Sequence, residues 1–227
     1  MPTFGLLHGA WHGAWCWDRV VPELERRGAG AIAVELPADD AAATMADYVD
    51  ATVDALRGAA EPVVLAGHSL AGLVIPRVAA VRPVARLVYL CAFVPRPGVS
   101  WFEQKEQALA PGFASEALVD ADRCQVWPSA EVAAADLYPD CDPETAAWAA
   151  ARLRRQCYGL MRDVFEGRPD EAPAVSVLAR EDTVVRPDYS RRAARELLGA
   201  DPIEMEGGHN PQLARPAELA ELLLRLA

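Results

Sequence analysis

The sequence predicts an α/β fold, a mostly parallel sheet with helices on both faces and a helical insert above it. Short apolar runs without polar alternation, typical of strands buried on both faces, alternate with helical segments through most of the chain. One such run, over residues 63–66, leads through a Gly-rich turn into a helix. The alternation stops once, between residues 93 and 171, where aromatic residues and alanine-rich segments gather.

The same patterns place the elements in order along the chain. Buried strands are expected over 3–7, 31–36, 63–66, 86–92, 173–179 and 202–205. Helices are expected over 16–27, 44–57, 70–81, 189–198 and 216–226. Gly28 and Gly58 suit the ends of the first two helices, and Thr44 suits the start of the second. Pro76 should kink the third helix or confine its first turns.

These boundaries divide the chain into a core of residues 1–92 and 172–227 and a cap insert of residues 93–171. A length of 227 residues fits one large α/β domain with such an excursion. Within the insert, helical segments are expected near 131–137 and 144–157, and no buried strand stands out. A helical cap is therefore predicted, lying over the sheet.

The charge balance bears on possible partners. The chain carries 33 acidic and 22 basic residues, a net charge of -11, and should repel nucleic acid and anionic membranes. No charged leader followed by an apolar stretch is visible, and no run reaches the roughly 18 apolar residues of a membrane span. We therefore expect a cytoplasmic protein with neither nucleic acid nor membrane as partner, and a homodimer remains open.

Cysteine and lysine usage narrows the chemistry further. The five cysteines contain no C-x-x-C pair and are odd in number, so neither a disulfide framework nor a zinc site is expected. Buried free thiols in a reducing cytoplasm are the prediction for all of them: Cys16, Cys91, Cys124, Cys141 and Cys157. The only lysine is Lys105, in the insert. We predict no metal site and no cofactor.

The Gly-rich turn after residues 63–66 has the form of a nucleophile elbow around Ser69. A strand that reverses abruptly into a helix leaves room only for very small side chains two positions either side of the turn residue, and Gly67 and Ala71 satisfy this. The turn lifts the Ser69 hydroxyl above the sheet. The next backbone N–H, that of Leu70, lies at a helix start, where the dipole favours developing negative charge.

A second Gly-rich loop, over residues 8–15, follows the first strand. Loops at the carboxyl edge of an open α/β sheet present free N–H groups where ligands bind. Ala10 is therefore a candidate for the second oxyanion N–H. Trp11 in this loop and three tryptophans of the insert are candidates for substrate contact: Trp101, Trp127 and Trp148.

Two later strand ends complete a catalytic set with Ser69. Asp182 follows the strand over 173–179, and His209 stands in a loop before the last helix. His209 would take the serine proton during attack on a carbonyl and return it to the leaving group, while Asp182 would fix the imidazole tautomer. Asp188 and Asp163 compete for the acid's role, but the first suits a helix cap and the second lies in the insert.

The other histidines have a structural interpretation. Each occurs in a turn where an imidazole can bond to backbone, and none has a partner at metal-binding helical spacing: His8, His12 and His68.

At these motifs the chain resembles the α/β-hydrolases, and within them the group of plant methylesterases that includes salicylate-binding esterases, polyneuridine aldehyde esterase and the α/β-fold hydroxynitrile lyases. The similarity covers residues 8–17, 67–72, 181–182 and 207–209, whereas the insert matches the family's cap only loosely. The resemblance implies a triad of Ser69, Asp182 and His209. It also implies an oxyanion hole formed by the N–H groups of Ala10 and Leu70.

The chain departs from the usual pattern of the group in two places, and two further positions distinguish the branches within it. Ala71 replaces a usual glycine, and Gly207-Gly208 stands where many plant members have an acidic residue before the histidine. The lyase branch has a threonine where this chain has Gly9 and a lysine where it has Asn210, so the resemblance is to the esterase branch.

The sequence therefore predicts a cofactor-independent serine hydrolase of a small, largely apolar carboxylic ester, a methyl ester among the candidates. Its acyl-enzyme would form on Ser69. Two alternatives stay open: a lyase or other triad-dependent tailoring enzyme of secondary metabolism, and a ligand receptor that has kept the fold without turnover.

Overall fold

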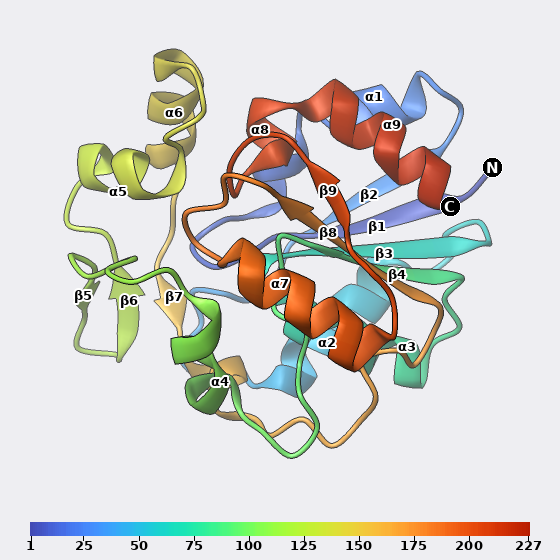
Figure 1. The fold of residues 1–227 in the computed structure, drawn as a ribbon, viewed down its shortest axis with the longest axis horizontal. Helices are drawn as coiled ribbons and strands as arrows, with labels where there is room; N and C mark the ends of the chain where they lie inside the picture. The colour runs from blue at the N-terminus through green and yellow to red at the C-terminus, as the bar shows by residue number, and fades with distance from the viewer.

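The computed structural model describes all residues, 1–227, and its centre is a six-stranded sheet in which every neighbouring pair is parallel. The strands are β1 (Thr3–Leu7), β2 (Gly30–Val34), β3 (Val63–His68), β4 (Arg86–Leu90), β8 (Ala174–Ala179) and β9 (Ile203–Met205). Their order in the sheet is β2-β1-β3-β4-β8-β9 (Figure 1). All six strands predicted from the apolar runs are present, within a few residues of the expected bounds.

Helices cover both faces of this sheet, as the fold class requires (Figure 1). One face packs on α1 (Val21–Glu25) and α9 (Pro216–Leu226), and the other on α2 (Met45–Ala55), α3 (Ile75–Val81) and α7 (Pro187–Ala193). Alternate residues of a strand point to opposite faces, so β3 places Val64 in the first core and Leu65 in the second. Both faces being covered explains why the strands are apolar throughout.

The helix after β1 is shorter than expected. The chain forms a 3-10 helix, η1 (Ala14–Trp17), and α1 begins only at Val21. Pro22 lies in the first turn of α1, the one place where its missing N–H costs no helical bond. Pro76 acts in the same way after the elbow, where a 3-10 helix, η2 (Ser69–Leu73), precedes α3. The prediction that Pro76 confines the first turns is confirmed.

The remaining helical segments follow the predicted order. Thr44 and Asp47 form a capping box at the start of α2. After α7 the chain continues as a π-helical turn, η4 (Ala194–Leu198), and α8 (Pro211–Ala214) precedes α9.

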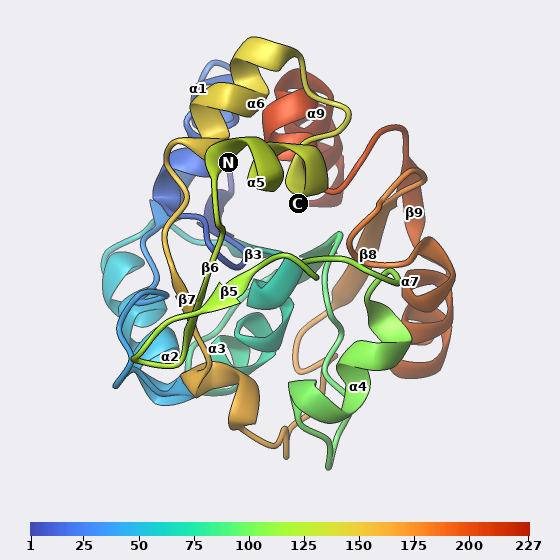
Figure 2. The ribbon, with the colours of Figure 1, turned by 90° about the vertical axis from the view of Figure 1, so that its left-hand side faces the viewer.

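The insert lies over the carboxyl ends of the strands (Figure 2). Its helices are α4 (Trp101–Ala108), α5 (Ala130–Leu137), α6 (Pro143–Ala150) and the 3-10 turn η3 (Gly159–Arg162). Between them lies a small antiparallel sheet of β5 (Leu118–Val119), β6 (Cys124–Val126) and β7 (Gln156–Cys157), which corrects the expectation of a cap without strands. Strands of two or three residues are too short to show a periodicity in sequence.

A disulfide joins Cys124 of β6 to Cys157 of β7. The prediction that all five cysteines are free thiols is therefore wrong for this pair. The two residues are 33 positions apart but directly opposite in the antiparallel ladder, a proximity that spacing along the chain does not reveal. The free cysteines are Cys16, Cys91 and Cys141.

Arg154 explains why α6 stops earlier than predicted. Its backbone N–H donates to the carbonyl of Trp11 at 2.7 Å, and its guanidinium donates to the carbonyl of His12 at 3.0 Å. These bonds to the Gly-rich loop of the core replace further helical turns, so tertiary contacts outweigh the helix propensity of the alanine-rich segment. No helix of the chain has the length and apolar character needed to cross a membrane.

Candidate active site

Ser69 occupies the sharp turn between β3 and η2, with a φ of 52°. This left-handed conformation is strained for a residue with a side chain and holds the hydroxyl above the sheet edge. A Cβ at Gly67 would lie 2.8 Å from Cγ2 of Ile75, and one at Gly72 would lie 2.1 Å from the carbonyl oxygen of Phe93. Both glycines are therefore required by close packing, while Ala71 is accommodated as a buried residue.

His209 and Asp182 meet across the loops that follow β9 and β8. His209 Nδ1 donates to Oδ2 of Asp182 at 2.9 Å, and both side chains are 2% exposed. The other carboxylate oxygen, Oδ1, accepts from the N–H groups of Val184 at 2.8 Å and Val185 at 2.9 Å. The carboxylate is thus oriented by backbone, and the proton on Nδ1 leaves Nε2 of His209 free to accept one.

The competing carboxylates are occupied elsewhere. Asp188 forms a two-bond pair with Arg186, at 3.0 and 2.6 Å, and its side chain is 60% exposed. Asp163 pairs with Arg77 on α3. Neither carboxylate has a bond to His209, so the structure brings only Asp182 to the imidazole.

Three further histidines are buried beside the site, and each bonds to a backbone carbonyl as the sequence predicts. His8 Nδ1 donates to Gly9 at 2.9 Å, His12 Nδ1 to Ala10 at 2.7 Å, and His68 Nε2 to His209 at 2.9 Å. Burial disfavours the imidazolium, lowering the pKa of His8 to about 3 and of His12 to about 4, and it lowers that of His68 well below its usual value. These neutral rings shape the loops without adding charge.

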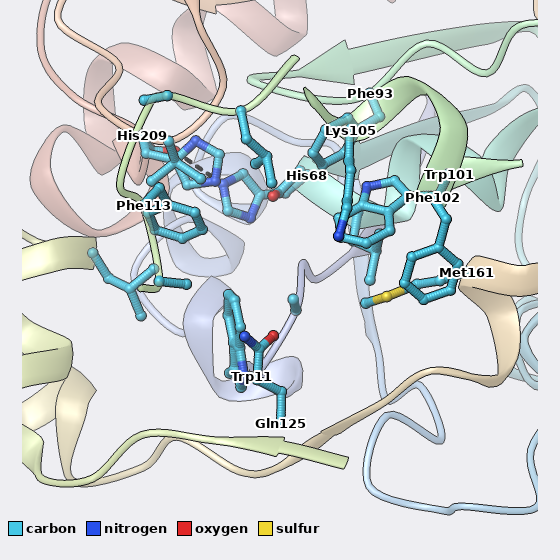
Figure 3. Close-up of a pocket in the computed structure, with 18 of the residues that line it drawn as sticks. Trp11, His68, Phe93, Trp101, Phe102, Lys105, Phe113, Gln125, Met161 and His209 are labelled. Atoms are coloured by element: carbon cyan, nitrogen blue, oxygen red, sulfur yellow. Dashed lines mark hydrogen bonds between the residues drawn. The ribbon is translucent and has the colours of Figure 1, made fainter. Parts of the chain in front are cut away.

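A cavity of about 500 Å³ opens onto Ser69 and His209, between the strand ends and the insert (Figure 3). Of its 22 lining residues 14 are hydrophobic, which suits a small ligand with a large apolar part. Ala10 and Leu70 line it beside Ser69. Their N–H groups belong to the loop after β1 and to the start of η2, the two segments from which an oxyanion hole was expected.

The four candidate tryptophans separate into two groups. Trp11 and Trp101 line the cavity. Trp127 and Trp148 are not among its lining residues: the ring centroid of Trp127 lies 5.3 Å from that of Trp11, and the centroid of Trp148 lies 5.3 Å from that of Trp15. The rings of Trp127 and Trp148 take part in the aromatic packing between insert and core, and a contact of either with substrate stays a prediction.

Sequence reasoning missed two residues of the site. Lys105 of α4 lines the cavity, although nothing in the sequence distinguishes it from a surface lysine except its being the only one. Asp140, in the loop between α5 and α6, accepts from the N–H of Gly208 at 2.6 Å, next to His209. The signal for Asp140 was the pair of glycines before the histidine: a Cβ at Gly208 would lie 2.7 Å from its carboxylate.

Asn210, the residue after His209, also takes part in the contact between the insert and the loop that carries His209. Its side-chain amide is fully buried and donates to the carbonyl of Leu137 at 2.7 Å, so it fixes the loop and does not line the cavity. No group of three or more histidine, cysteine or acidic side chains is arranged to hold a metal ion.

The comparisons with known proteins agree with this geometry. The profile of the Alpha/beta hydrolase family matches residues 6–222. The Probable esterase PIR7A of Oryza sativa is 30% identical over 252 residues, covering 99% of this chain and 96% of the rice protein. Methylesterase 7 of Arabidopsis thaliana is 25% identical over 262 residues, covering 99% and 95% of the two chains.

Among solved structures, a pyrethroid hydrolase from Sphingobium faniae JZ-2 superimposes with a TM-score of 0.82 and 26% identity, covering 100% of this chain and 97% of that one. Its match extends over the insert as well as the sheet, so the whole architecture is shared. The chain therefore belongs to the alpha/beta hydrolase family.

Proposed function

We propose that the protein is a carboxylesterase-type serine hydrolase that cleaves small, largely apolar carboxylic esters through an acyl-enzyme on Ser69. The observation that carries the proposal is the 2.9 Å bond between His209 and Asp182 at a cavity that both Ser69 and His209 line. The esterase, methylesterase and pyrethroid hydrolase names of the relatives support it.

The geometry gives each residue a role. Ser69 Oγ attacks the ester carbonyl carbon while Nε2 of His209 takes its proton, and the Asp182 carboxylate stabilises the resulting imidazolium. The negative charge on the carbonyl oxygen is held by the N–H groups of Ala10 and Leu70. Collapse expels the alcohol, which receives the proton from His209.

Deacylation, the second half of the catalytic cycle, repeats the same proton transfers with water in place of the Ser69 hydroxyl. His209 takes a proton from a water molecule that attacks the acyl carbon, and the tetrahedral intermediate collapses to release the carboxylic acid and restore Ser69. Every group needed for this cycle is a residue of the chain, and we propose that it needs no cofactor.

A trapping experiment tests the proposal. The protein is mixed with methyl and p-nitrophenyl esters of increasing acyl length, quenched in acid after milliseconds, and digested for mass spectrometry. We expect an acyl group on the peptide that contains Ser69, at an occupancy that rises and decays with turnover. Ester hydrolysis without acylation of that peptide would contradict it.

Lyase chemistry is the second candidate, and two observations weigh against it. A Cβ at Gly9, where the lyase branch has threonine, would lie 2.8 Å from Cβ of Ser69. Release of cyanide, an anion, favours a nearby cation, and two arginines of the insert that could supply one are bonded elsewhere: Arg152 to the carbonyl of Trp148, and Arg155 to Asp120 and Asp122. Lys105 lines the cavity, so one cation that could stabilise a leaving cyanide is present there. Cyanide release from mandelonitrile, compared with ester hydrolysis, separates the two reactions, and a receptor would show neither.

The cellular location and the partners of the protein stay predictions. Its acidic charge supports the absence of nucleic acid and anionic membrane partners, and the homodimer stays an open alternative. The Cys124–Cys157 disulfide weighs against the expected cytoplasmic location, because disulfides persist mainly in oxidising compartments.

A further inference from the structure

Lys105 places the only lysine of the chain at the cavity that holds Ser69. It projects from α4 in the insert, and Figure 3 shows its side chain reaching into the cavity beside the rings of Trp101 and Phe102. Its Nζ lies 5.5 Å from the centroid of the first ring and 5.3 Å from that of the second. Two aromatic faces attract the ammonium and hold it in place.

The ammonium has no acidic partner. No carboxylate oxygen lies within 4.0 Å of Nζ, although the chain has 33 acidic residues against 22 basic ones. Glu106, the next residue, also lines the cavity but does not pair with it. Lys105 is half-buried at the edge of a mostly apolar cavity, so a ligand anion bound there would be a direct partner for its charge.

We propose that the cavity selects esters that carry a carboxylate away from the ester bond, and that Lys105 is the residue that recognises it. This inference rests on the proposed ester hydrolysis. The substrate class is the monoester of a dicarboxylic acid or an ester of similar shape: an apolar linker fits the hydrophobic lining, the ester lies at Ser69, and the free carboxylate lies at Lys105.

The experiment compares pairs of esters that differ only in charge. Monomethyl esters of succinic, adipic and suberic acid are each measured against the corresponding dimethyl ester, and the readout is the ratio of the two kcat/KM values. Because both esters of a pair are measured on the same protein, their kcat/KM ratio is unaffected by a general loss of activity. Lys105→Met keeps the aliphatic stem and the contact with the rings, Lys105→Arg restores the charge, and Arg152→Met removes one positive charge from the insert outside the cavity.

We expect the ratio for the best linker length to fall about tenfold in Lys105→Met, the effect of one charge-assisted hydrogen bond. It should recover in Lys105→Arg and stay at the wild-type value in Arg152→Met. Glu106→Gln should raise it, because a negative charge beside the bound carboxylate is removed. An equal fall in Lys105→Met and Arg152→Met would mean that only net charge matters and would overturn the assignment.

A binding measurement keeps this inference separate from the proposed chemistry. Calorimetric titration of Ser69→Ala with monomethyl adipate should show binding that Lys105→Met weakens about tenfold in the double variant. The role of Lys105 alone would be overturned if Ser69 hydrolysed esters with no preference for the charged ester at any linker length, and if Lys105→Met did not weaken the binding of monomethyl adipate. Absence of ester hydrolysis would overturn the proposed function, while charge-dependent binding to the Ser69→Ala protein would still support the recognition of a carboxylate.

Discussion

The Asp140 carboxylate accepts a hydrogen bond of 2.6 Å from the backbone N–H of Gly208, the residue before His209. Asp140 belongs to the insert and Gly208 to the core, so the bond ties the cap to the loop that carries the catalytic base. The nearby bond from Asn210 to the carbonyl of Leu137, at 2.7 Å, ties the same two segments on the other side of His209. The cap thus positions the histidine as well as enclosing the cavity.

Asp140→Ala should therefore lower kcat about tenfold while KM changes less, because the N–H of Gly208 loses its acceptor and the imidazole loses its orientation. Steady-state kinetics check this, with Asp122→Ala, which removes an exposed acid of the insert, as the control. A matching loss in both variants, or unchanged kcat in Asp140→Ala, would show that the bond does not position His209.

Asp182→Asn should lower kcat by roughly 10³–10⁴-fold, because an amide favours the wrong imidazole tautomer. Asp188→Asn should change kcat little, since its carboxylate pairs with Arg186 on the surface. Thermal unfolding, followed by circular dichroism, checks that both variants are as stable as the wild type before their kcat values are compared. If Asp188→Asn proved the more damaging, the orienting acid would be misassigned.

Acid should destabilise the fold through its buried histidines. The folded-state pKa is about 3 for His8 and about 4 for His12, both below the unfolded value near 6.5, so between these limits the unfolded chain binds more protons. Stability is then complete above about pH 6.5 and falls by up to about 1.4 kcal/mol per pH unit for each histidine as pH drops. Urea unfolding at pH 7 and pH 5 measures the loss; equal free energies at the two pH values would contradict it.

The Cys124–Cys157 disulfide should stabilise the cap. The closed loop spans a separation of 33 residues, for which chain-entropy reasoning gives about 2–4 kcal/mol. The double variant with serine at both positions should therefore melt at lower temperature, whereas Cys141→Ser, a free cysteine, should not. KM should also rise, because the adjacent residues Gln125 and Tyr158 line the cavity. Identical melting of the double variant and wild type would contradict the role of the crosslink.

The sequence predicted the sheet and the three residues now proposed as the triad because both depend on local patterns. Buried strands are apolar runs, and the elbow is a short motif whose glycines are forced by packing around Ser69. The relations between distant segments could not be predicted in this way. Asp140 meets Gly208 across 68 positions, and Lys105 reaches the cavity only because α4 folds back over the strand ends.

The cap was the least predictable part for a further physical reason. Its strands are two or three residues long and are defined by their pairing, and β6 meets β7 through residues separated by 33 positions. Its tryptophans pack between cap and core or line the cavity, and apolar composition alone does not separate these two uses.

Labelling by a fluorophosphonate tests the central claim, that Ser69 is an activated nucleophile, most directly. Wild-type protein and Ser69→Ala are treated side by side, and the labelled peptide is located by mass spectrometry while p-nitrophenyl acetate hydrolysis is followed in the same samples. We predict one label on the peptide containing Ser69, and loss of both labelling and hydrolysis in a Ser69→Ala protein that keeps its circular dichroism spectrum. Labelling or hydrolysis that persists in Ser69→Ala would contradict the assignment.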